Sequence, residues 1–197
     1  TGIPVYMPWL GKKAYDGIMA AYTAASRKNG KKYIPLIKNA TQLHVIEKGA
    51  LCGAVLDGSY NLTEANYKTS LQNLVDRVLI TDKDGNQIGV VEDTAAQQKY
   101  GVVQTVYKQE DGKDAQTEAK ALLQTLEQTG SVTGCPGDSR AVSGYALIVQ
   151  ETTTGLFGKF YIESDTHTFT DGKHEMALTL AFSNMMDEKE IENQSQG

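Results

Sequence analysis

Apolar and polar positions follow two different periods along this chain of 197 residues. In the N-terminal part the spacing is helical, and an Asn-Gly pair at 29–30 is expected to end a helix whose apolar face is formed by Ala14, Ile18, Ala21, Tyr22 and Ala25. The stretch 32–49 then predicts two short strands around a turn at Asn39, with Pro35 placing the first strand at a sheet edge. Residues 1–56 are therefore predicted to form a small α+β unit.

From about residue 70 onward the period changes to that of β-strands. Two apolar runs flank Asp84-Gly85, which is a strong hairpin signal, and a third strand follows at 100–109. A helix is predicted over about 112–129, because Asp111 or Asp114 can cap its start and the glycine at 130 can end it. Its apolar face consists of Ala115, Ala119, Leu122, Leu123 and Leu126. More strands are expected at "SVTG", at "GYALIVQ" and in a C-terminal hairpin.

These elements predict an α+β fold that is mainly β. The polar, turn-rich residues 57–69 are expected to be a linker after the first unit. A small β-barrel with one inserted helix is expected over 70–187, and 188–197 form a polar C-terminal tail.

Composition removes several classes of function. The net charge is −5 and the basic residues are scattered apart from a short run at 28–32, so specific nucleic-acid binding is not expected. No segment approaches the ~18 consecutive apolar residues of a membrane span. The two cysteines, Cys52 and Cys135, do not form a CxxC pair and are expected to be free thiols. The chain begins with Thr and without a signal-peptide pattern, as expected of a processed product or a fragment.

The hairpin "FYIESDTHTFTDGKHEMALTLAF", residues 160–182, is the strongest candidate for chemistry. A two-residue Asp171-Gly172 loop would place Phe169 opposite His174 and His167 opposite Met176, which makes the two histidines diagonal neighbours ~7–8 Å apart between backbones. Together with Asp165, which such a register places opposite Leu178, they could bind a metal.

Zinc sites usually supply three or four ligands, so a structural hairpin is favoured over a metal site. A bulge or a three-residue turn would instead turn Thr166 and Thr168 toward the Met/Leu face of the second strand, and the sequence does not decide between these registers.

Other candidate residues lack the partners that catalysis requires. Cys135 lies in a Pro-Gly turn cluster without a nearby histidine, and His44 is most simply a strand residue. The segment Asp82–Asn86 has its glycine at the wrong offset for a calcium loop and predicts a turn. The acids near the hairpin are Glu163, Asp165 and Glu175. No catalytic, metal or cofactor-binding residue is assigned, and no cofactor is expected.

The C-terminal third resembles the closing hairpin of contractile-tail baseplate hub proteins, the late-control-D-like family of phages and phage-derived particles. The shared elements are a "THTF" strand, a short turn with glycine and "H-x-M-x-L-T-L", here formed by Thr166, His167, Thr168, Phe169, His174, Met176, Leu178, Thr179 and Leu180. Upstream, Tyr100, Gly101 and Gln104 fit the family's "YG-x-x-Q", and "AQTEAKALL" fits its Ala-rich segment. "PVYMPWLGKKAYDGIMAAY" is similar to the segment that opens the preceding domain.

Two departures qualify this resemblance. The family's "RAG" is represented by Arg140 and Ala141, whereas Gly144 comes three residues later. The family's N-terminal barrel has no counterpart before residue 1, so the chain would be the C-terminal portion of a hub or a shortened member.

The resemblance implies a structural function. Hub proteins form a homotrimer in which paired barrels present a near-sixfold ring to the tail tube and a threefold face to the spike. Partners would be other copies of the chain, tube and spike proteins, without a membrane. The chain would assemble in the bacterial cytoplasm and then lie in the baseplate of a virion or tail-like particle. Its acidic balance would suit a lumen through which DNA passes without sticking.

Two alternatives stay open. A tail-associated peptidoglycan hydrolase would need paired acids or a Cys/His site, for which Glu163, Asp165, His167 and His174 are the plausible nucleus. A carbohydrate-binding β module would need exposed aromatic residues on one platform, but the single tryptophan, Trp9, lies outside the β region and the tyrosines are dispersed.

Overall fold

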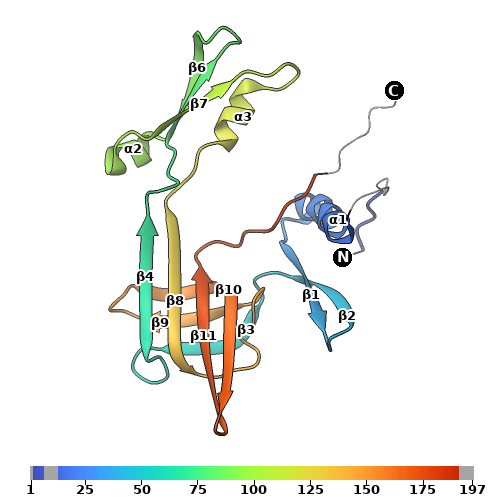
Figure 1. Cartoon of the computed structure of the whole chain (residues 1–197), viewed down its shortest axis with the longest axis vertical. Coiled ribbons are helices and arrows are strands. Elements are labelled where there is room, and N and C mark those ends of the chain that lie inside the picture. Colours follow the sequence, from blue (N-terminus) through green and yellow to red (C-terminus); the bar gives the residue numbers. More distant parts are fainter. Residues whose placement is uncertain (1, 7–12, 191–197) are drawn as a thin grey trace. The chain divides into compact units, whose positions relative to one another are not determined.

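The computed structural model describes residues 2–6 and 13–190 and consists mainly of β-strands (Figure 1). Its helices are α1 (Ala14–Asn29), α2 (Thr94–Tyr100) and α3 (Ala115–Ala121). Its strands are β1 (Tyr33–Lys38), β2 (Gln42–Glu47), β3 (Leu51–Asp57), β4 (Glu64–Ser70), β5 (Arg77–Thr81), β6 (Gln87–Glu92), β7 (Gln104–Lys108), β8 (Glu127–Pro136), β9 (Ala146–Glu151), β10 (Leu156–Thr170) and β11 (Lys173–Ala181).

The chain divides into two compact units. The first combines residues 1–67 with 129–197, and the second is Lys68–Gln128. These borders differ from those expected from the sequence, because β3 pairs with β9, a partner about 90 residues away along the chain. The expected linker 57–69 contains most of β4, which is an edge strand of the large sheet. Such distant pairings leave no local signal in the sequence.

The first unit is built on a six-stranded sheet with the order β3-β9-β10-β11-β8-β4. The expected barrel is wrong: β3 and β4 end the sheet without pairing to each other in the described part of the chain, so the sheet is open. The edge at β3 is covered by a side chain instead. Asn61 accepts a hydrogen bond from the amide of Asp57 at 2.7 Å and donates one to the carbonyl of Val55 at 3.0 Å, as a neighbouring strand would.

The core of this unit lies on one face of the sheet. In β11 the alternation predicted from the sequence is confirmed, because Met176, Leu178 and Leu180 are buried and the residues between them are partly exposed. The buried residues of the other strands that pack with them include Leu56, Val132, Leu147, Val149, Leu156, Phe160 and Ile162. A core of this size holds the strands firmly enough to fix the loops at their ends.

Helix α1 and the β1–β2 hairpin form as predicted. Gly30 ends the helix in a left-handed conformation with φ 71°, and Asn39 and Ala40 form the turn with φ 50° and 62°. Pro35 lies in a sheet of only two strands, where both strands are edges.

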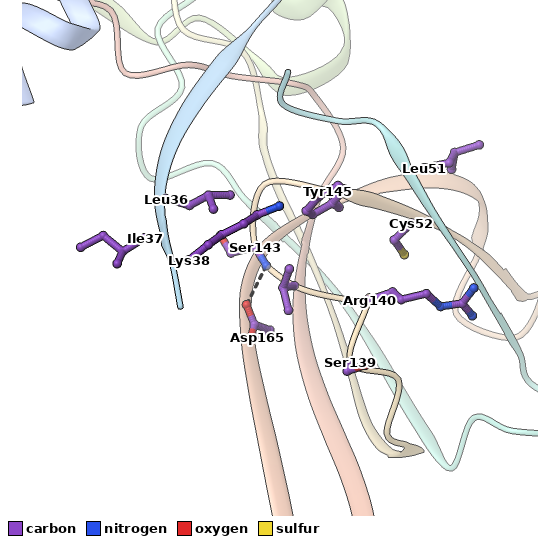
Figure 2. Close-up of a pocket in the computed structure, with 11 residues that line it drawn as sticks. Leu36, Ile37, Lys38, Leu51, Cys52, Ser139, Arg140, Ser143, Tyr145 and Asp165 are labelled. Atoms are coloured by element: carbon purple, nitrogen blue, oxygen red, sulfur yellow. Dashed lines mark hydrogen bonds between the residues drawn. The ribbon is translucent and has the colours of Figure 1, made fainter. Parts of the chain in front are cut away.

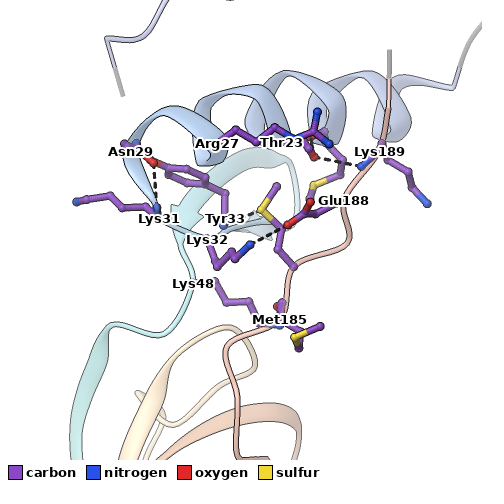
Figure 3. A network of polar contacts seen from close by, with 12 residues as sticks. Thr23, Arg27, Asn29, Lys31, Lys32, Tyr33, Lys48, Met185, Glu188 and Lys189 are labelled. Atoms are coloured by element: carbon purple, nitrogen blue, oxygen red, sulfur yellow. Dashed lines mark hydrogen bonds and ion pairs between the residues drawn. The ribbon is translucent and has the colours of Figure 1, made fainter. Parts of the chain in front are cut away.

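The segment that follows β11, up to residue 190, passes beside the loop before β1 and reaches α1 (Figure 3). Asn184 and Met185 contact Lys48, and the sulfur of Met186 lies 3.3 Å from the amide of Tyr33. Further along, ion pairs join Lys32 to Glu188 and Arg27 to Glu190. The first residues of the expected polar tail, 188–190, are therefore bound to α1 and to Lys32 by side-chain contacts that its composition did not reveal.

The second unit has a three-stranded sheet with the order β6-β5-β7 and a helix on one face. The predicted β5–β6 hairpin is confirmed, and α3 packs Ala119 on Val78 and Ile80. Helix α3 is shorter than the predicted 112–129 although Asp114 caps it as expected. It ends early because Gln124 exchanges backbone hydrogen bonds with Val75.

Two further local features differ from the sequence prediction. Gly130 does not end a helix but lies buried in β8 beside Leu180. Helix α2 was not predicted, because it buries none of its residues and therefore has no apolar stripe. Its only signal is Asp93, whose side chain accepts a hydrogen bond from the amide of Ala96.

Among the described residues, none of the helices has the length and apolar character needed to cross a membrane.

Candidate functional site

The β10–β11 hairpin has the register that a two-residue loop predicts. Phe169 pairs with His174, His167 with Met176 and Asp165 with Leu178, and the loop residues Asp171 and Gly172 have φ 50° and 75°. The two histidines are diagonal neighbours on one face, as predicted. The alternative register, with Thr166 and Thr168 on this face, is wrong.

A bulge at Glu163 explains how polar and apolar residues share this face. Ile162 pairs with Leu180 and Asp165 pairs with Leu178, so Glu163 is the extra residue between them. Without the bulge, Ile162 and Asp165 would point to opposite faces. The bulge therefore lets the base of β10 complete the core while its outer half presents Asp165 and His167 on the same side.

The two histidines contact each other and the loop between β8 and β9. Nδ1 of His167 lies 2.9 Å from Nε2 of His174, and Nε2 of His167 lies 3.2 Å from the carbonyl oxygen of Ala141. A carbonyl can only accept, so Nε2 of His167 carries a hydrogen, and in the neutral ring Nδ1 accepts from His174. The hydrogen-bond network thus fixes the tautomer of each ring.

This contact has the shape of a hydrogen bond rather than of a metal chelate. The ring centroids are 5.1 Å apart, close to the greatest separation that rings with nitrogens 2.9 Å apart can have. The nitrogens therefore lie almost on the line between the rings, whereas two metal ligands would both point to a third position. Within residues 2–6 and 13–190, no group of three or more His, Cys, Asp or Glu side chains could hold a metal ion.

The loop 137–143 is tied to the hairpin by further hydrogen bonds, and we call it the latch loop. The amide of Gly137 donates to the carbonyl of His174 at 2.7 Å, and the amide of Ser143 donates to Oδ1 of Asp165 at 2.6 Å. The hydroxyl of Ser143 also donates to the carbonyl of Glu163 at 2.8 Å. These roles of Gly137 and Ser143 were not predicted, because nothing in the local sequence shows which strand a loop will contact.

Gly137 has a steric role as well. A Cβ at this position would lie 2.1 Å from ring carbons of His174, so only glycine lets the loop approach the ring this closely. Phe169 also stacks on this ring, at a centroid distance of 4.1 Å. The His174 ring therefore contacts both the latch loop and Phe169.

A cleft of about 610 Å³ lies between the latch loop, β1 and the start of β3 (Figure 2). Its volume is in the range of small-molecule sites. Its lining residues are Leu36, Ile37, Lys38, Leu51, Cys52, Ser139, Arg140, Val142, Ser143, Tyr145 and Asp165. Two of the charged groups here are already engaged: Arg140 forms two hydrogen bonds with Asp138, whose pKa this guanidinium holds below its usual range, and Asp165 accepts from Ser143.

The remaining sequence candidates lie apart from this cluster or are inert. Cys135 is fully buried, and burial raises the pKa of its thiol to about 11, so it is a poor nucleophile at neutral pH. His44 is exposed in β2, opposite Leu36. Asp82 organises a turn by accepting hydrogen bonds from Asp84 and Asn86. Trp9 lies outside the described residues.

Asp165 is the one predicted acid that contacts a histidine. Its Oδ2 lies 3.6 Å from Nε2 of His167, while its Oδ1 accepts the hydrogen bond from Ser143. Glu163 takes part through its backbone carbonyl, and Glu175 pairs with Thr168, which places it on the opposite face of the hairpin. The arrangement positions a loop, and both ring nitrogens of His167, Nε2 of His174 and Oδ1 of Asp165 take part in these contacts.

Comparisons with known proteins relate this chain to phage-derived proteins. The profile of a family described as YQBQ-like matches residues 5–181. The chain is 26% identical over 145 residues to the phage-like element PBSX protein XkdQ of Bacillus subtilis (strain 168), which covers 68% of this chain and 44% of XkdQ. Among solved structures, the 43 kDa tail protein of prophage MuSo2 from Shewanella oneidensis has a similar fold, with a TM-score of 0.54 and 13% identity over 76% of this chain and 49% of that protein. The chain thus spans less than half the length of each.

Proposed function

Because this chain belongs to the YQBQ-like family, whose profile matches residues 5–181, we propose that it is a structural component of a phage or prophage tail. The observation that carries the proposal is the family match together with the similarity to XkdQ, which is named as a protein of a phage-like element. The fold shared with a prophage tail protein agrees with it.

The polar groups of the candidate site support a role without catalysis. His167, Asp165 and Ser143 make hydrogen bonds that hold the latch loop on the hairpin, and His174 contacts His167 within the hairpin. A general acid or base must keep an atom available to the substrate in a productive pose. Here the buried core and the hydrogen bonds around it keep the sheet rigid. A subunit of a large assembly requires such rigidity.

More specifically, the chain acts as a baseplate hub subunit in a ring that joins the tail tube to the spike. The resemblance of "THTF" and "H-x-M-x-L-T-L" to late-control-D-like hub proteins supports this role. A ring subunit must avoid pairing its sheet edges with wrong partners, and the cover that Asn61 places on the β3 edge serves that need. The ring would be a homotrimer, with tube and spike proteins as its other partners.

The proposal is tested by locating the chain in purified tail particles and counting its copies by quantitative mass spectrometry. We expect three copies per particle, at the tube end that carries the spike. Absence from intact particles, or a copy number equal to that of the tube protein, would contradict the hub role.

The alternative of a peptidoglycan hydrolase is tested by zymography on cell-wall substrate. Asp165→Asn is the informative variant, because asparagine keeps an acceptor for the amide of Ser143 while removing the acid. Glu175→Gln on the opposite face of the hairpin is the matched control. We expect no clearing from any of the three proteins; clearing by the wild type that only Asp165→Asn abolishes would establish an enzyme.

A further inference from the structure

Three consecutive residues of β1, Leu36, Ile37 and Lys38, border the 610 Å³ cleft (Figure 2). Side chains alternate between the two faces of a strand, so three consecutive residues border one cavity when that cavity lies along the strand edge. In its two-stranded sheet, β1 has one edge paired with β2 and one free edge. The cleft therefore lies along the free edge of β1.

The hydrogen bonds of the β1–β2 hairpin show which backbone groups point to this edge. The amide of Lys48 donates to the carbonyl of Lys32, one position before the first pair of the ladder. Hydrogen-bonded and non-hydrogen-bonded pairs alternate in an antiparallel ladder, so every second residue from Tyr33 onward directs its N–H and C=O away from β2. Two observations agree with this: the amide of Tyr33 contacts the sulfur of Met186, and Pro35, which has no N–H, lies at such a position.

By this alternation, Ile37 directs both its N–H and its C=O to the free edge of β1. In the described part of the chain, neither group takes part in a backbone hydrogen bond outside the ladder from which it points away. Strand β3, whose first residues Leu51 and Cys52 border the same cleft, is the edge of the large sheet. Asn61 covers the other end of that edge, at Val55. The cleft thus lies beside two uncovered stretches of strand edge.

The charge of the cleft differs from that of the whole chain. Its lining carries two positive charges and one negative charge, whereas the chain has a net charge of −5. Arg140 pairs with Asp138, and Asp165 accepts a hydrogen bond from the amide of Ser143. Among residues 2–6 and 13–190, no acid forms an ion pair with the exposed ammonium of Lys38. The cleft therefore favours a ligand that brings a carboxylate to Lys38.

From the free edge and the charge together, we propose that the cleft binds an extended acidic segment of a partner protein, which adds to β1 as an antiparallel strand. One residue of the segment exchanges two hydrogen bonds with Ile37. The residue before it lies opposite Lys38 and supplies the carboxylate, and the residue after it lies opposite Leu36 and is apolar. The segment thus reads acid, any residue, apolar residue. This binding does not depend on the role of the chain in a tail.

The peptide acetyl-Thr-Glu-Thr-Val-Thr-amide is the probe, because it has this order and its threonines favour the extended state. It is added at millimolar concentrations to the labelled chain, and binding is followed by NMR. We expect the signals of residues 36–38 and 139–145 to shift and the hydrogen exchange of the Ile37 amide to slow. Unchanged exchange of Ile37, or shifts confined to other residues, would overturn the proposal.

Methylation of the peptide nitrogens separates strand addition from binding by side chains alone, and it leaves the protein unchanged. N-methylation of the central threonine removes the N–H that donates to the carbonyl of Ile37, and we expect the affinity to fall about tenfold or more. N-methylation of the valine modifies an N–H that points away from β1, so binding should be kept. Equal losses from the two methyl groups would contradict strand addition.

The charge is tested by replacing the glutamate of the peptide with glutamine. The wild-type chain should prefer the glutamate peptide by about two- to fivefold, as expected of an opposite-charge cross-strand pair. The preference should vanish in Lys38→Gln and persist in Lys28→Gln, the matched control at an exposed lysine of α1. Equal affinities of the wild type for both peptides would overturn the requirement for an acid.

A last measurement distinguishes a foreign segment from a second copy of this chain. Without peptide, the exchange of the Ile37 amide should not depend on the concentration of the chain. Protection of Ile37 that appears as the chain is concentrated would show that a second copy fills the cleft, and it would overturn the assignment to a partner protein.

Discussion

The two Asp-Gly hairpins of this chain have the same local signal and different surroundings. Around Asp84-Gly85, β5 and β6 meet in a turn that is held by the carboxylate of Asp82 from within the turn itself. Around Asp171-Gly172, β10 and β11 are longer and are held by a loop and a core from elsewhere in the chain. The turn sequence thus determines that a hairpin forms, while distant residues determine what the hairpin does.

The faces of the two hairpins differ in the same way. In β11 the core-facing row is nearly inaccessible, with Leu180 0% exposed, whereas β6 faces its smaller core with Gly89 and Val91 and leaves Ile88 and Val90 on its other face 52% and 37% exposed. Mutations that remove distant contacts should therefore affect the β10–β11 hairpin most, and mutations within the turn should matter mainly for β5–β6.

The largest effect is expected from Leu180→Ala. Removing a fully buried leucine side chain should lower the free energy of unfolding by ~2–5 kcal/mol. Val90→Ala in β6 should cost less than about 1 kcal/mol, because this side chain is partly exposed. Urea denaturation followed by circular dichroism, with hydrogen exchange of β11 amides to identify the unit that unfolds, measures both. Equal costs would contradict the contrast between the hairpins.

A comparison of two glycine substitutions separates tertiary from local constraints. Gly137→Ala places a Cβ 2.1 Å from ring atoms of His174 and should destabilise the hairpin by ~1–3 kcal/mol by overpacking. In Gly85→Ala the new Cβ meets no other atom. The only cost is the left-handed backbone conformation with φ 90°, which should destabilise the protein by ~1–2 kcal/mol. In NMR spectra only Gly137→Ala should shift the ring signals of His167 and His174. Unchanged ring signals in that variant would show that the latch loop does not need the close approach.

A smaller effect is expected from the local carboxylate of the β5–β6 turn. Asp82→Ala removes the acceptor of the Asp84 and Asn86 amides and should lower the local stability of the turn, detected as faster exchange of β5 and β6 amides. Asp82→Asn keeps an acceptor, and its loss of stability should be less than half of that in Asp82→Ala. The exchange of β10 and β11 amides should stay unchanged in both variants, and a change there would mean that the two hairpins are energetically coupled.

The turn between β9 and β10 offers a dependence on pH. The hydroxyl and amide of Thr154 and the amide of Thr153 donate to the Glu151 carboxylate and lower its pKa to about 2. Since the pKa is lower in the folded than in the unfolded chain, this contribution to stability is complete above the unfolded pKa of ~4.3 and is lost as the pH falls through about 2. Carbon NMR of the Glu151 carboxyl should show this titration, and Glu151→Gln should reduce the acid dependence of stability. A midpoint near 4 would contradict the turn geometry.

The sequence predicted those features that depend on neighbouring residues. Helix α1 with its Gly30 end, the turn at Asn39, the two Asp-Gly hairpins and the pairing of His167 with Met176 all follow from local periodicity and turn chemistry. The length of α3 was wrong because residues 122–126 are apolar at helical spacing but Gln124 binds the distant Val75. A helix without a buried face, α2, gave no periodic signal at all.

The candidate site could be predicted only in part. The hairpin register placed the two histidines together, since both lie on one local element. The partners that define their chemistry are Ala141, Ser143 and Gly137, which belong to a loop that is separated from the hairpin by strand β9. The open sheet could not be predicted from the sequence either. The parallel pairing of β3 with β9 is a long-range feature, and the cover that Asn61 gives to the β3 edge depends on side-chain contacts.

Static and dynamic light scattering of the purified chain over a wide range of concentrations tests the ring role most directly. If the chain is a hub subunit that assembles through its own contacts, the mass should reach three times the 21.4 kDa of one chain, either constantly or by a monomer–trimer equilibrium. A mass of 21.4 kDa that does not change up to the highest concentration would contradict the claim that this chain forms the ring.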